Sequence, residues 1–548
     1  MTIGWMRRIL ERMIRMKHKI IRLLTMTLLV VMTVCTTVFA EGKTLRLTQN
    51  VEMDTMDSGN TGDGYTTSIM SLLVDSLFRL DADSQPQPAL AESYEVSDDG
   101  LTYTFHLRDS QWSNGEEVTA ADFEYAWKRA ANPAGGFEHT FLFNYLPLKN
   151  LKEINAGEAD YTTLGVTAVD AKTLVVELTT PCDWLIRFLS DCAFSPLNQK
   201  FVESCGDQYA LSSDTLLTCG AYRLENWTAG DLTWTLTKNE NYWNAENVKI
   251  DTIEYQVIKD TQTGIMAYES DQADFVILTS DVVAMYRDSD AFYNAPTTYS
   301  WYVVPNFKDA TVSNQNLLYA IGFSINREAL VNNILCDGSL AKYDCNYSDV
   351  FFDADGNEFN SVRPDFWSCD KEAAKAYWEA AKAELGVDSL ALDFTVEDSE
   401  SAQSVAAFIQ SEVESTCPGL LLNLKVMPKA QRLDEMENGK FQLALHRTGS
   451  SVPNVLAKLG QYTTGQSLNY AGYSNAEYDA LYNATLTETD STVIWNNCLD
   501  LEEMAQRAAV AIPVYRTADC LLVRPTISNY YHNLVGISWD FMFADIGE

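Results

Sequence analysis

The chain has 548 residues, of which 46% are hydrophobic and 11% aromatic, so it can bury a large core and form about two to four domains. Its formal net charge of −37 at pH 7 argues against nucleic-acid binding, which requires a basic surface.

The N-terminal segment 1–40 has the pattern of an export signal. Residues 1–22 are basic, and residues 23–34 form an apolar run that is short for a membrane span and typical of a signal h-region. Val38-Phe39-Ala40 then offers residues that signal peptidase accepts. We therefore predict cleavage after Ala40 and a location in the periplasm or at the outer face of the cell membrane.

Two other fates of this segment stay open. Cys35 would carry a lipid anchor if it were the processing site, although Val34 before it is larger than the small residue that such a signal prefers. The segment could also remain as an uncleaved anchor. No other stretch of the sequence is long and apolar enough to cross a bilayer.

In chain order, the first elements are a strand over 44–50, a Gly- and Asp-rich loop over 51–65 and a helix over 66–80. Residues 98–112 then predict a half-buried strand, because apolar residues alternate with polar ones. The apolar positions of this strand are Leu101, Tyr103, Phe105 and Leu107.

A turn, a capped helix and a stop signal follow in residues 113–133. Thr119 is the predicted N-cap, and Asp122 three residues later completes a box-like pair. Asn132-Pro133 ends the helix, because the residue before proline avoids the α region. One face is apolar and consists of Phe123, Ala126, Trp127 and Ala130.

The later part of the chain changes in character. Residues 172–181 predict another strand, and residues 219–258 predict several antiparallel strands. A long helix is expected over 314–335, and a second helix over 370–386 with a glycine stop. Strands and helices then alternate over 389–446, which predicts βαβ units and a mostly parallel sheet. Two lobes without a disordered linker suggest a hinge and a ligand cleft between them.

Ten cysteines follow the predicted signal, and an even number in an exported chain favours disulfides. The pairs Cys205/Cys219 and Cys336/Cys345 are close enough in sequence to be candidate loop staples, but the connectivity cannot be deduced.

The sequence shows no catalytic, metal-binding or cofactor motif. It contains no GxSxG, HExxH, P-loop, GxGxxG or CxxC pattern, and its five histidines are scattered. Residues 353–358, DADGNE, resemble a calcium loop but lack the spacing and closing Glu of an EF-hand, so a solvated turn is the alternative. We predict no catalytic residue, metal or cofactor.

An aromatic segment, 297–307, lies where the second lobe begins. It contains Tyr299, Trp301, Tyr302 and Phe307, which belong either to a core strand or to a strand that lines the cleft.

Residues 88–129 strongly resemble the signature region of the extracellular solute-binding proteins of peptide ABC transporters, the oligopeptide/dipeptide-binding family. Residues 51–57 match the opening loop of that family, although Met56 replaces the usual Leu and Ser58 the Pro. Further matching blocks cover most of residues 44–530 in the right order, namely 164–181, 219–227, 235–253, 323–331 and 511–530.

The resemblance implies an α/β fold of two lobes, the class II-like periplasmic-binding-protein fold, with an extra inserted domain and a cleft between the lobes. The expected division is a signal peptide at 1–40, a discontinuous lobe I at 41–87, 205–298 and 496–548, an inserted domain II at 88–204 and lobe III at 299–495.

The resemblance also implies a monomer without catalytic activity that captures oligopeptides and delivers them to membrane permease subunits with their ATPases. Such proteins pair backbone groups with the peptide main chain, and wet side-chain pockets tolerate varied sequences. The positions that match the cleft lining of the family are Asp63, Tyr65, Thr66, Phe141, Tyr145, Trp301, Tyr302 and Asn306.

One departure from the family concerns the ligand's ammonium group. After the strand at 440–446, peptide binders carry a Gly-Trp pair and, three residues beyond the Trp, an Asp that holds the ammonium. Without gaps these positions are Arg447-Thr448 and Ser451. A buried ammonium needs a charge partner, which Ser451 cannot be. Either Arg447 holds an amine-blocked or anionic ligand, or Arg447 points to solvent, or another acid such as Asp63 substitutes, or a gap spoils the comparison.

Three alternative functions remain open. The ligand could be a non-peptide, such as a nickel chelate or a sugar. An exported hydrolase would require a nucleophile and a base, which the sequence does not show. A signalling receptor would bind peptides without transport.

Overall fold

The computed structural model describes residues 42–547 except 62–63, 183, 279, 347–350, 354–355, 363–365, 450–453, 467, 487, 489 and 535–536, and it leaves out the side chains of 138–141 and 280–281. The predicted signal peptide, Cys35, Asp63 and Ser451 therefore lie outside the described residues. Within the described part, no helix combines the length and the apolar character that crossing a membrane requires.

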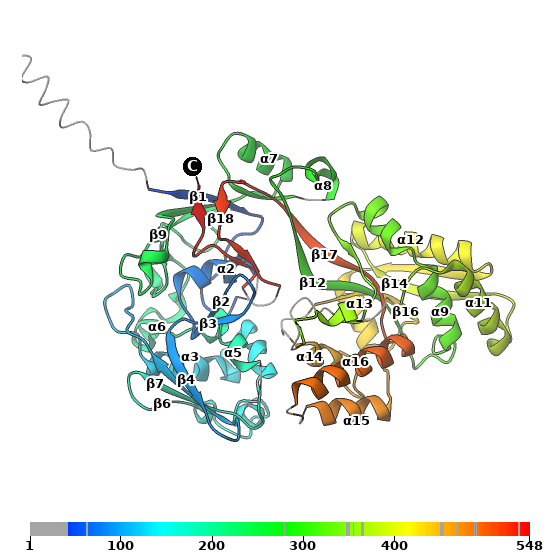
Figure 1. Ribbon diagram of the computed structural model, residues 1–548, viewed down its shortest axis with the longest axis horizontal. Coiled ribbons are helices and arrows are strands. Elements are labelled where there is room, and N and C mark those ends of the chain that lie inside the picture. The colour runs from blue at the N-terminus through cyan, green and yellow to red at the C-terminus, as the bar shows by residue number, and fades with distance from the viewer. Residues whose placement is uncertain are drawn as a thin grey trace, which may run out of the picture.

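An 11-stranded sheet extends from one half of the molecule to the other (Figure 1). Its strand order is β15-β14-β16-β12-β17-β11-β1-β10-β9-β8, and β13 pairs with β17. We call the half that contains β1 the β1 half and the half that contains β14 to β16 the β16 half. The strands are β1 Thr44–Gln49, β8 Tyr222–Glu225, β9 Thr233–Lys238, β10 Thr252–Val257, β11 Phe275–Leu278, β12 Phe292–Pro305, β13 Leu340–Ala341, β14 Leu390–Glu397, β15 Leu420–Met427, β16 Leu443–Thr448 and β17 Ile512–Val523.

A separate four-stranded sheet lies in the β1 half, in the order β4-β5-β7-β6. It contains β4 Ala91–Val96, β5 Thr102–Leu107, β6 Val166–Ala168 and β7 Thr173–Glu177. β5 buries alternate residues, as predicted.

Helix α3, Ala120–Ala130, packs on β6 and β7 of that sheet. Thr119 and Asp122 form the predicted capping box, in which the Thr119 backbone N–H donates to Asp122 Oδ2 at 2.8 Å. The predicted apolar face is buried.

The predicted helix over 66–80 is wrong at its C-terminal end. Helix α2, Gly64–Leu73, stops early, and Phe78–Leu80 form strand β2, which pairs with β3, Pro86–Pro88. The backbone N–H of Phe78 and the hydroxyl of Ser76 both donate to the carbonyl of Leu189. The carbonyl of Leu189 thus accepts hydrogen bonds from a segment that is not helical. The local sequence pattern could not reveal this distant acceptor.

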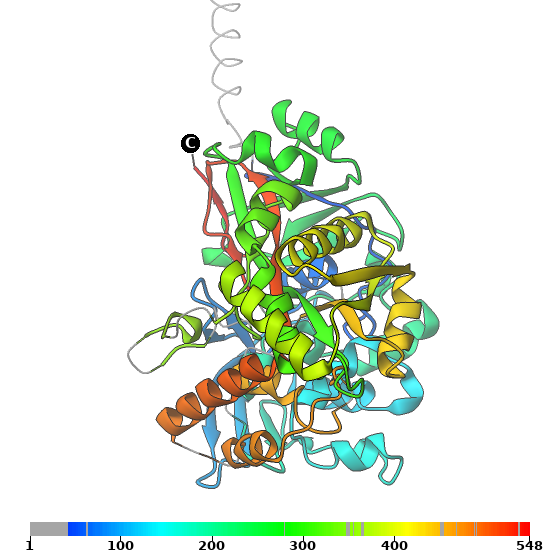
Figure 2. The same cartoon turned by 90° about the vertical axis from the view of Figure 1, so that its right-hand side faces the viewer.

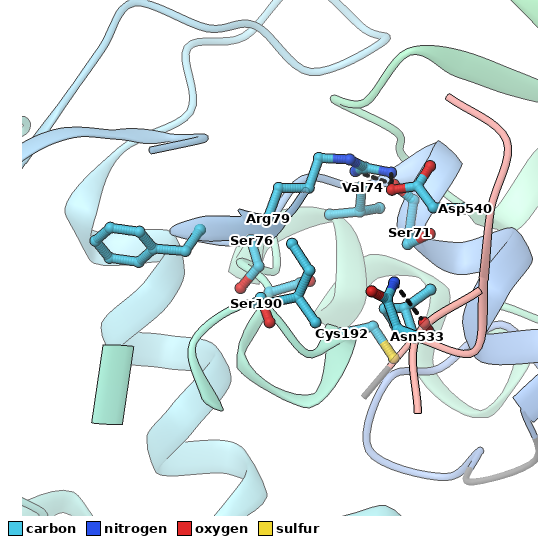
Figure 3. Close-up of a pocket in the computed structure, with 12 residues that line it drawn as sticks. Ser71, Val74, Ser76, Arg79, Ser190, Cys192, Asn533 and Asp540 are labelled. Carbon is cyan, nitrogen blue, oxygen red and sulfur yellow. Dashed lines mark hydrogen bonds and ion pairs between the residues drawn. The ribbon is translucent and has the colours of Figure 1, made fainter. Parts of the chain in front are cut away.

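Arg79, which follows on β2, reaches the C-terminal segment (Figure 3). Its guanidinium donates to Asp540 Oδ2 at 2.8 Å and to Asp75 Oδ1 at 3.2 Å. Asp75 also accepts from Tyr242 at 2.7 Å and from Trp243 at 2.8 Å. This buried network fixes the end of the chain against α2.

The predicted helix over 314–335 is interrupted. Helix α9, Gln315–Ser324, ends before Asn326, whose side chain caps the short helix α10, Arg327–Ala329, and a π-helical turn η8 follows at Leu330–Leu335. The buried guanidinium of Arg327 donates to the carbonyls of Gly322 and Ile325, which the end of α9 leaves without helical partners.

The β16 half contains the predicted βαβ units. β14 is parallel to both β15 and β16. Its helices are α11 Lys371–Leu385, α12 Glu400–Thr416, α13 Lys429–Glu437, α14 Val455–Gly460, α15 Ala476–Thr485 and α16 Ser491–Ala508. In Figure 2, which faces this half, the orange helices α15 and α16 lie below the yellow segments that include α12 and β15. α16 shares a buried cluster with Tyr302 and Val455 through its residues Trp495, Cys498, Leu501 and Ala505.

β12 and β17 join the two halves. They are antiparallel partners, with register shifts at Pro296/Ser300 and Trp301/Tyr302. At one end of the pair, Ala295 and Leu521 belong to the core of the β1 half. At the other end, Val303 and Val514 belong to the core of the β16 half. The bulges interrupt the ladder between these two anchored ends, which makes this ribbon the expected hinge.

Neither candidate disulfide forms, because Cys205, Cys219, Cys336 and Cys345 carry free thiols. In the proposed Cys336/Cys345 pair, the Cys336 thiol donates to Asn332 O at 3.1 Å, and the Cys345 thiol donates to Ala511 O at 3.3 Å. Each sulfur thus faces a different backbone carbonyl, a geometry that sequence proximity does not predict.

Candidate ligand-binding site

Strand β16 carries an open edge next to the hinge. On one side it pairs with β12 over its whole length, from Leu443 to Thr448. On the other side β14 pairs with it over Leu443 and Ala444. Among the described residues, the β14-side edge of residues 445–448 therefore has no ladder partner, and an extended chain could bind there as an added strand.

A cavity of about 240 Å³ has residues 446–448 of β16 in its lining. Its walls are the β12/β16 pair, the segment 461–471 and residues 510–511. Whole small-molecule pockets measure about 300–1,000 Å³, so this cavity suits one part of a ligand. None of the described residues that line it is acidic.

Lys458 of α14 lies directly behind the cavity wall and is 4% exposed. Its Nζ donates to Thr448 Oγ1 at 3.3 Å and to Gln461 Oε1 at 3.1 Å, and both acceptors line the cavity. Burial, with a contribution from the charge of Lys342, lowers the pKa of Lys458 to about 7. Within the described part of the chain, no carboxylate forms an ion pair with this amine.

His446 lines the same cavity and is held by a second buried cation. Its Nδ1 lies 2.8 Å from the guanidinium of Arg432, which is 1% exposed and also pairs with Glu397 at 3.3 Å. Burial and the neighbouring positive charges lower the pKa of His446 to about 3. The ring is therefore neutral at physiological pH.

Arg447, a predicted ligand residue, lines the cavity and is exposed. Its guanidinium stacks on Tyr299 at 4.8 Å and lies 6.0 Å from the ring of Trp301. Such stacking positions the charge while leaving its N–H groups available to a ligand.

Strand alternation separates Tyr302 from Trp301 on β12, and Asn306 follows directly after the strand. Tyr302 lines the cavity, and its hydroxyl points to Cys345 O at 3.5 Å. Trp301 faces the opposite core and stacks on Tyr515 at 5.9 Å. Asn306 is buried and donates to backbone carbonyls, one of them Phe441 O at 2.8 Å. Trp301 and Asn306 thus support the strand and do not line this cavity.

The remaining predicted positions lie in the β1 half. Tyr65 is half-buried and Thr66 buried in the first turn of α2. Tyr145 ends the 3₁₀ helix η2, Glu138–Tyr145, and is 39% exposed, and its ring packs 6.2 Å from Phe188. The side chains of Phe141, Asp63 and Ser451 lie outside the described residues.

Sequence reasoning placed Thr448 at the site, but it missed Lys458 and Gln461 as its neighbours. No local pattern marks them, because a lysine in a short helix resembles any surface lysine. Among the described residues, no three His, Cys, Asp or Glu side chains form a group that could hold a metal ion.

Comparison with known proteins identifies the family. Residues 85–470 match the bacterial extracellular solute-binding proteins, family 5 middle region, which is more than half of the chain. The chain belongs to this family. This family 5 protein is 30% identical to the dipeptide-binding protein of Lactococcus lactis subsp. cremoris, and the match covers 96% of this chain and 99% of the relative.

Solved structures confirm the two-lobed α/β fold of this family 5 protein. The substrate-binding domain of an oligopeptide ABC transporter from Bacillus anthracis has a TM-score of 0.73 and 30% identity, covering 93% of this chain and 99% of that one. OppA of Listeria monocytogenes, solved bound to peptide, has a TM-score of 0.72 and 28% identity, covering 93% and 100%.

Proposed function

We propose that this protein is the substrate-binding component of an ABC importer, which captures oligopeptides between its two halves and delivers them to a membrane permease. The relatives named as dipeptide- and oligopeptide-binding proteins support this function. The family is a family of binding proteins, and a purely binding, non-enzymatic role for this chain is part of the proposal.

The open edge of β16 at residues 445–448 is the observation that carries the proposal. Main-chain pairing with an extended peptide supplies affinity that does not depend on the peptide's sequence, whereas side-chain pockets supply preference. A folded ligand, such as a sugar, would make no use of a row of alternating N–H and C=O groups.

Residues on both halves would contact the ligand. We keep Tyr302 and Arg447 of the β16 half, and Asp63, Tyr65, Thr66, Phe141, Tyr145 and Ser451, as the proposed binding set. Closure about the β12/β17 ribbon would bring these residues together, because a ligand that binds the closed state better shifts the population towards it.

The proposed domain division follows the predicted boundaries, with one adjustment. The packing of α16 against Tyr302 and Val455 favours placing residues 496–511 with lobe III. Cleavage after Ala40, a monomeric state and docking to permease subunits with their ATPases are further parts of the proposal. The mass of the mature protein would report both the cleavage site and any lipid on Cys35.

Native mass spectrometry of the mature protein purified from its own cells, followed by denaturing release of its ligand, tests the function. Released peptides support the proposal, and a released non-peptide contradicts it. Turnover of a mixed peptide pool would contradict the non-enzymatic role. For the binding set, Arg447→Ala should weaken binding of the released ligand, and Ser451→Asp should improve affinity for free-amine peptides. Unchanged titration calorimetry for both variants would remove these two residues from the set.

A further inference from the structure

The polarity of the cavity beside β16 follows from the two buried cations behind it. Lysine and arginine side chains carry hydrogen-bond donors and no acceptors. Whatever they contact must therefore turn an acceptor towards them. This rule fixes the orientation of each polar group that stands between a cation and the cavity.

Gln461 is the first such group. Because Lys458 can only donate, the carboxamide of Gln461 turns its oxygen to Lys458 Nζ at 3.1 Å. Its two amide N–H groups are then the part of this lining residue that a ligand can meet. Thr448 accepts from Lys458 at 3.3 Å, and its own hydroxyl donates to Gly449 O at 3.4 Å.

His446 is fixed in the same way from the other side. Arg432 can only donate, so Nδ1 of His446 is the acceptor at 2.8 Å, and the proton of the neutral ring resides on Nε2. Tyr302 and Tyr462 do not offset this polarity, since both hydroxyls point to the carbonyl of Cys345. Two lining groups, the amide of Gln461 and Nε2 of His446, thus offer N–H donors to the cavity. The guanidinium of Arg447 lies with Tyr299 and Trp301 on the other face of the strand pair.

Among the described charged side chains behind the cavity wall, Lys458 is the cation without a carboxylate partner in an ion pair. Arg432 is compensated by Glu397, and Lys342 by Asp344, whereas Lys458 contacts neutral oxygens. Glu502, a buried carboxylate that acts on Lys458, accepts from the Cys345 backbone and from Asn346. Burial of a charged lysine among neutral partners costs free energy, so an anion bound in the cavity would offset that cost.

We propose that this cavity receives a carboxylate of the bound peptide, so that the protein prefers peptides with an acidic group at that position. This inference rests on the proposed peptide-binding function and names the class of peptide. Gln461 and His446 would hold the carboxylate directly. Lys458 would act as a positioning residue that orients and polarises Gln461. The apolar part of the wall, formed by Val304, Ala471 and Val510, suits the aliphatic stem of the acidic residue.

The test uses pentapeptides that differ by Glu or Gln at one position, with each position substituted in turn and each peptide made with a free and an amidated C-terminus. Titration calorimetry on the full mature protein should show at least one Glu peptide, or the free C-terminal acids, binding about tenfold or more tighter than the neutral partner. The position that shows the difference identifies whether a side chain or the C-terminus supplies the carboxylate.

Two variants test the roles of Lys458 and Gln461 in this preference. Lys458→Met and Gln461→Glu should each abolish the preference while retaining affinity for the neutral peptides, the first by removing the cation and the second by placing a carboxylate on the wall. Lys371→Met, which removes a surface charge from α11 in the same half, should leave the preference unchanged. Thermal unfolding checks that each variant is folded.

The outcomes separate the two proposals. If Glu and Gln peptides bind wild type equally at every position and with either terminus, the carboxylate inference is wrong and the peptide function stands. If Lys371→Met removes the preference as much as Lys458→Met, net charge is responsible and the inference is also wrong. If no peptide of the set binds, the proposed function fails and the inference with it.

Discussion

The ion pair between Asp57 and Arg129 should couple the opening loop of the chain to helix α3. The two guanidinium nitrogens donate to the two carboxylate oxygens at 2.9 and 2.6 Å, which is the bidentate geometry. Asp57 is 6% and Arg129 19% exposed in the side chain, so solvent screens the pair little. Asp57 also accepts from the Gly59 backbone at 3.1 Å.

We expect Asp57→Asn to lower the free energy of unfolding by about 2–3 kcal/mol. Removal of one partner of a buried pair costs about 3–5 kcal/mol, and the value here is smaller because Asn keeps the Gly59 bond and because Arg129 is partly exposed. Arg129→Met should cost a similar amount, since it leaves the Asp57 carboxylate buried.

Urea unfolding of the two single variants and of the double variant measures the coupling. Far-UV circular dichroism and tryptophan fluorescence must give coincident transitions for the free energies to be meaningful. The double variant should lose at least about 1 kcal/mol less than the two single losses together. Single losses below about 0.5 kcal/mol, or losses that add within about 0.5 kcal/mol, would refute the view that this pair ties the loop to α3.

Three further predictions follow from other parts of the molecule. Affinity for the preferred acidic peptide should fall as pH rises through about 7, because Lys458 loses its proton there in the free protein. Affinity for the matching Gln peptide should not change over the same pH range. Equal pH profiles for the two peptides would contradict the role of Lys458. The titratable and charged groups that act on or contact Lys458 are Tyr302, Lys342, Cys345, His446 and Glu502. Gly338→Ala should lower the free energy of unfolding in urea by about 2 kcal/mol more than Gly230→Ala. Both glycines have φ of +84°, but of the two only position 338 would place a Cβ within 4 Å of another atom, the Cys520 sulfur at 2.2 Å. Equal losses of stability would show that the clash relaxes. A thiol reagent should titrate all ten cysteines after Ala40 in denaturant without reductant, and a shortfall of two or more would reveal a disulfide.

Local sequence predicted those elements whose determinants lie within one or two turns. The Thr119/Asp122 box and the glycine after α11 act over three or four residues, and the alternation of β5 is visible within the strand itself. The family resemblance supplied the two-lobed fold, since long blocks matched in order. Arg447, where the sequence departs from the family, is among the residues that line the cavity, and its role in binding stays a prediction.

The failures share a physical cause. Helix α2 ends where Leu189, more than a hundred residues away, accepts the bonds of Ser76 and Phe78. The helix after Asn314 breaks where Arg327 buries its guanidinium among carbonyls from distant segments, including that of Pro513 at 2.8 Å. Hydrogen-bond partners of this kind have no signature in the local pattern.

The sequence by itself determined the class of the protein and those strands, helices and caps whose determinants are local, because these depend on neighbours along the chain. The tertiary structure alone decided which side of β12 faces the cavity, where β16 lacks a ladder partner among the described residues, and that Lys458 lies behind Thr448 and Gln461. Those features arise when segments distant in sequence are packed together and the buried polar groups must satisfy one another.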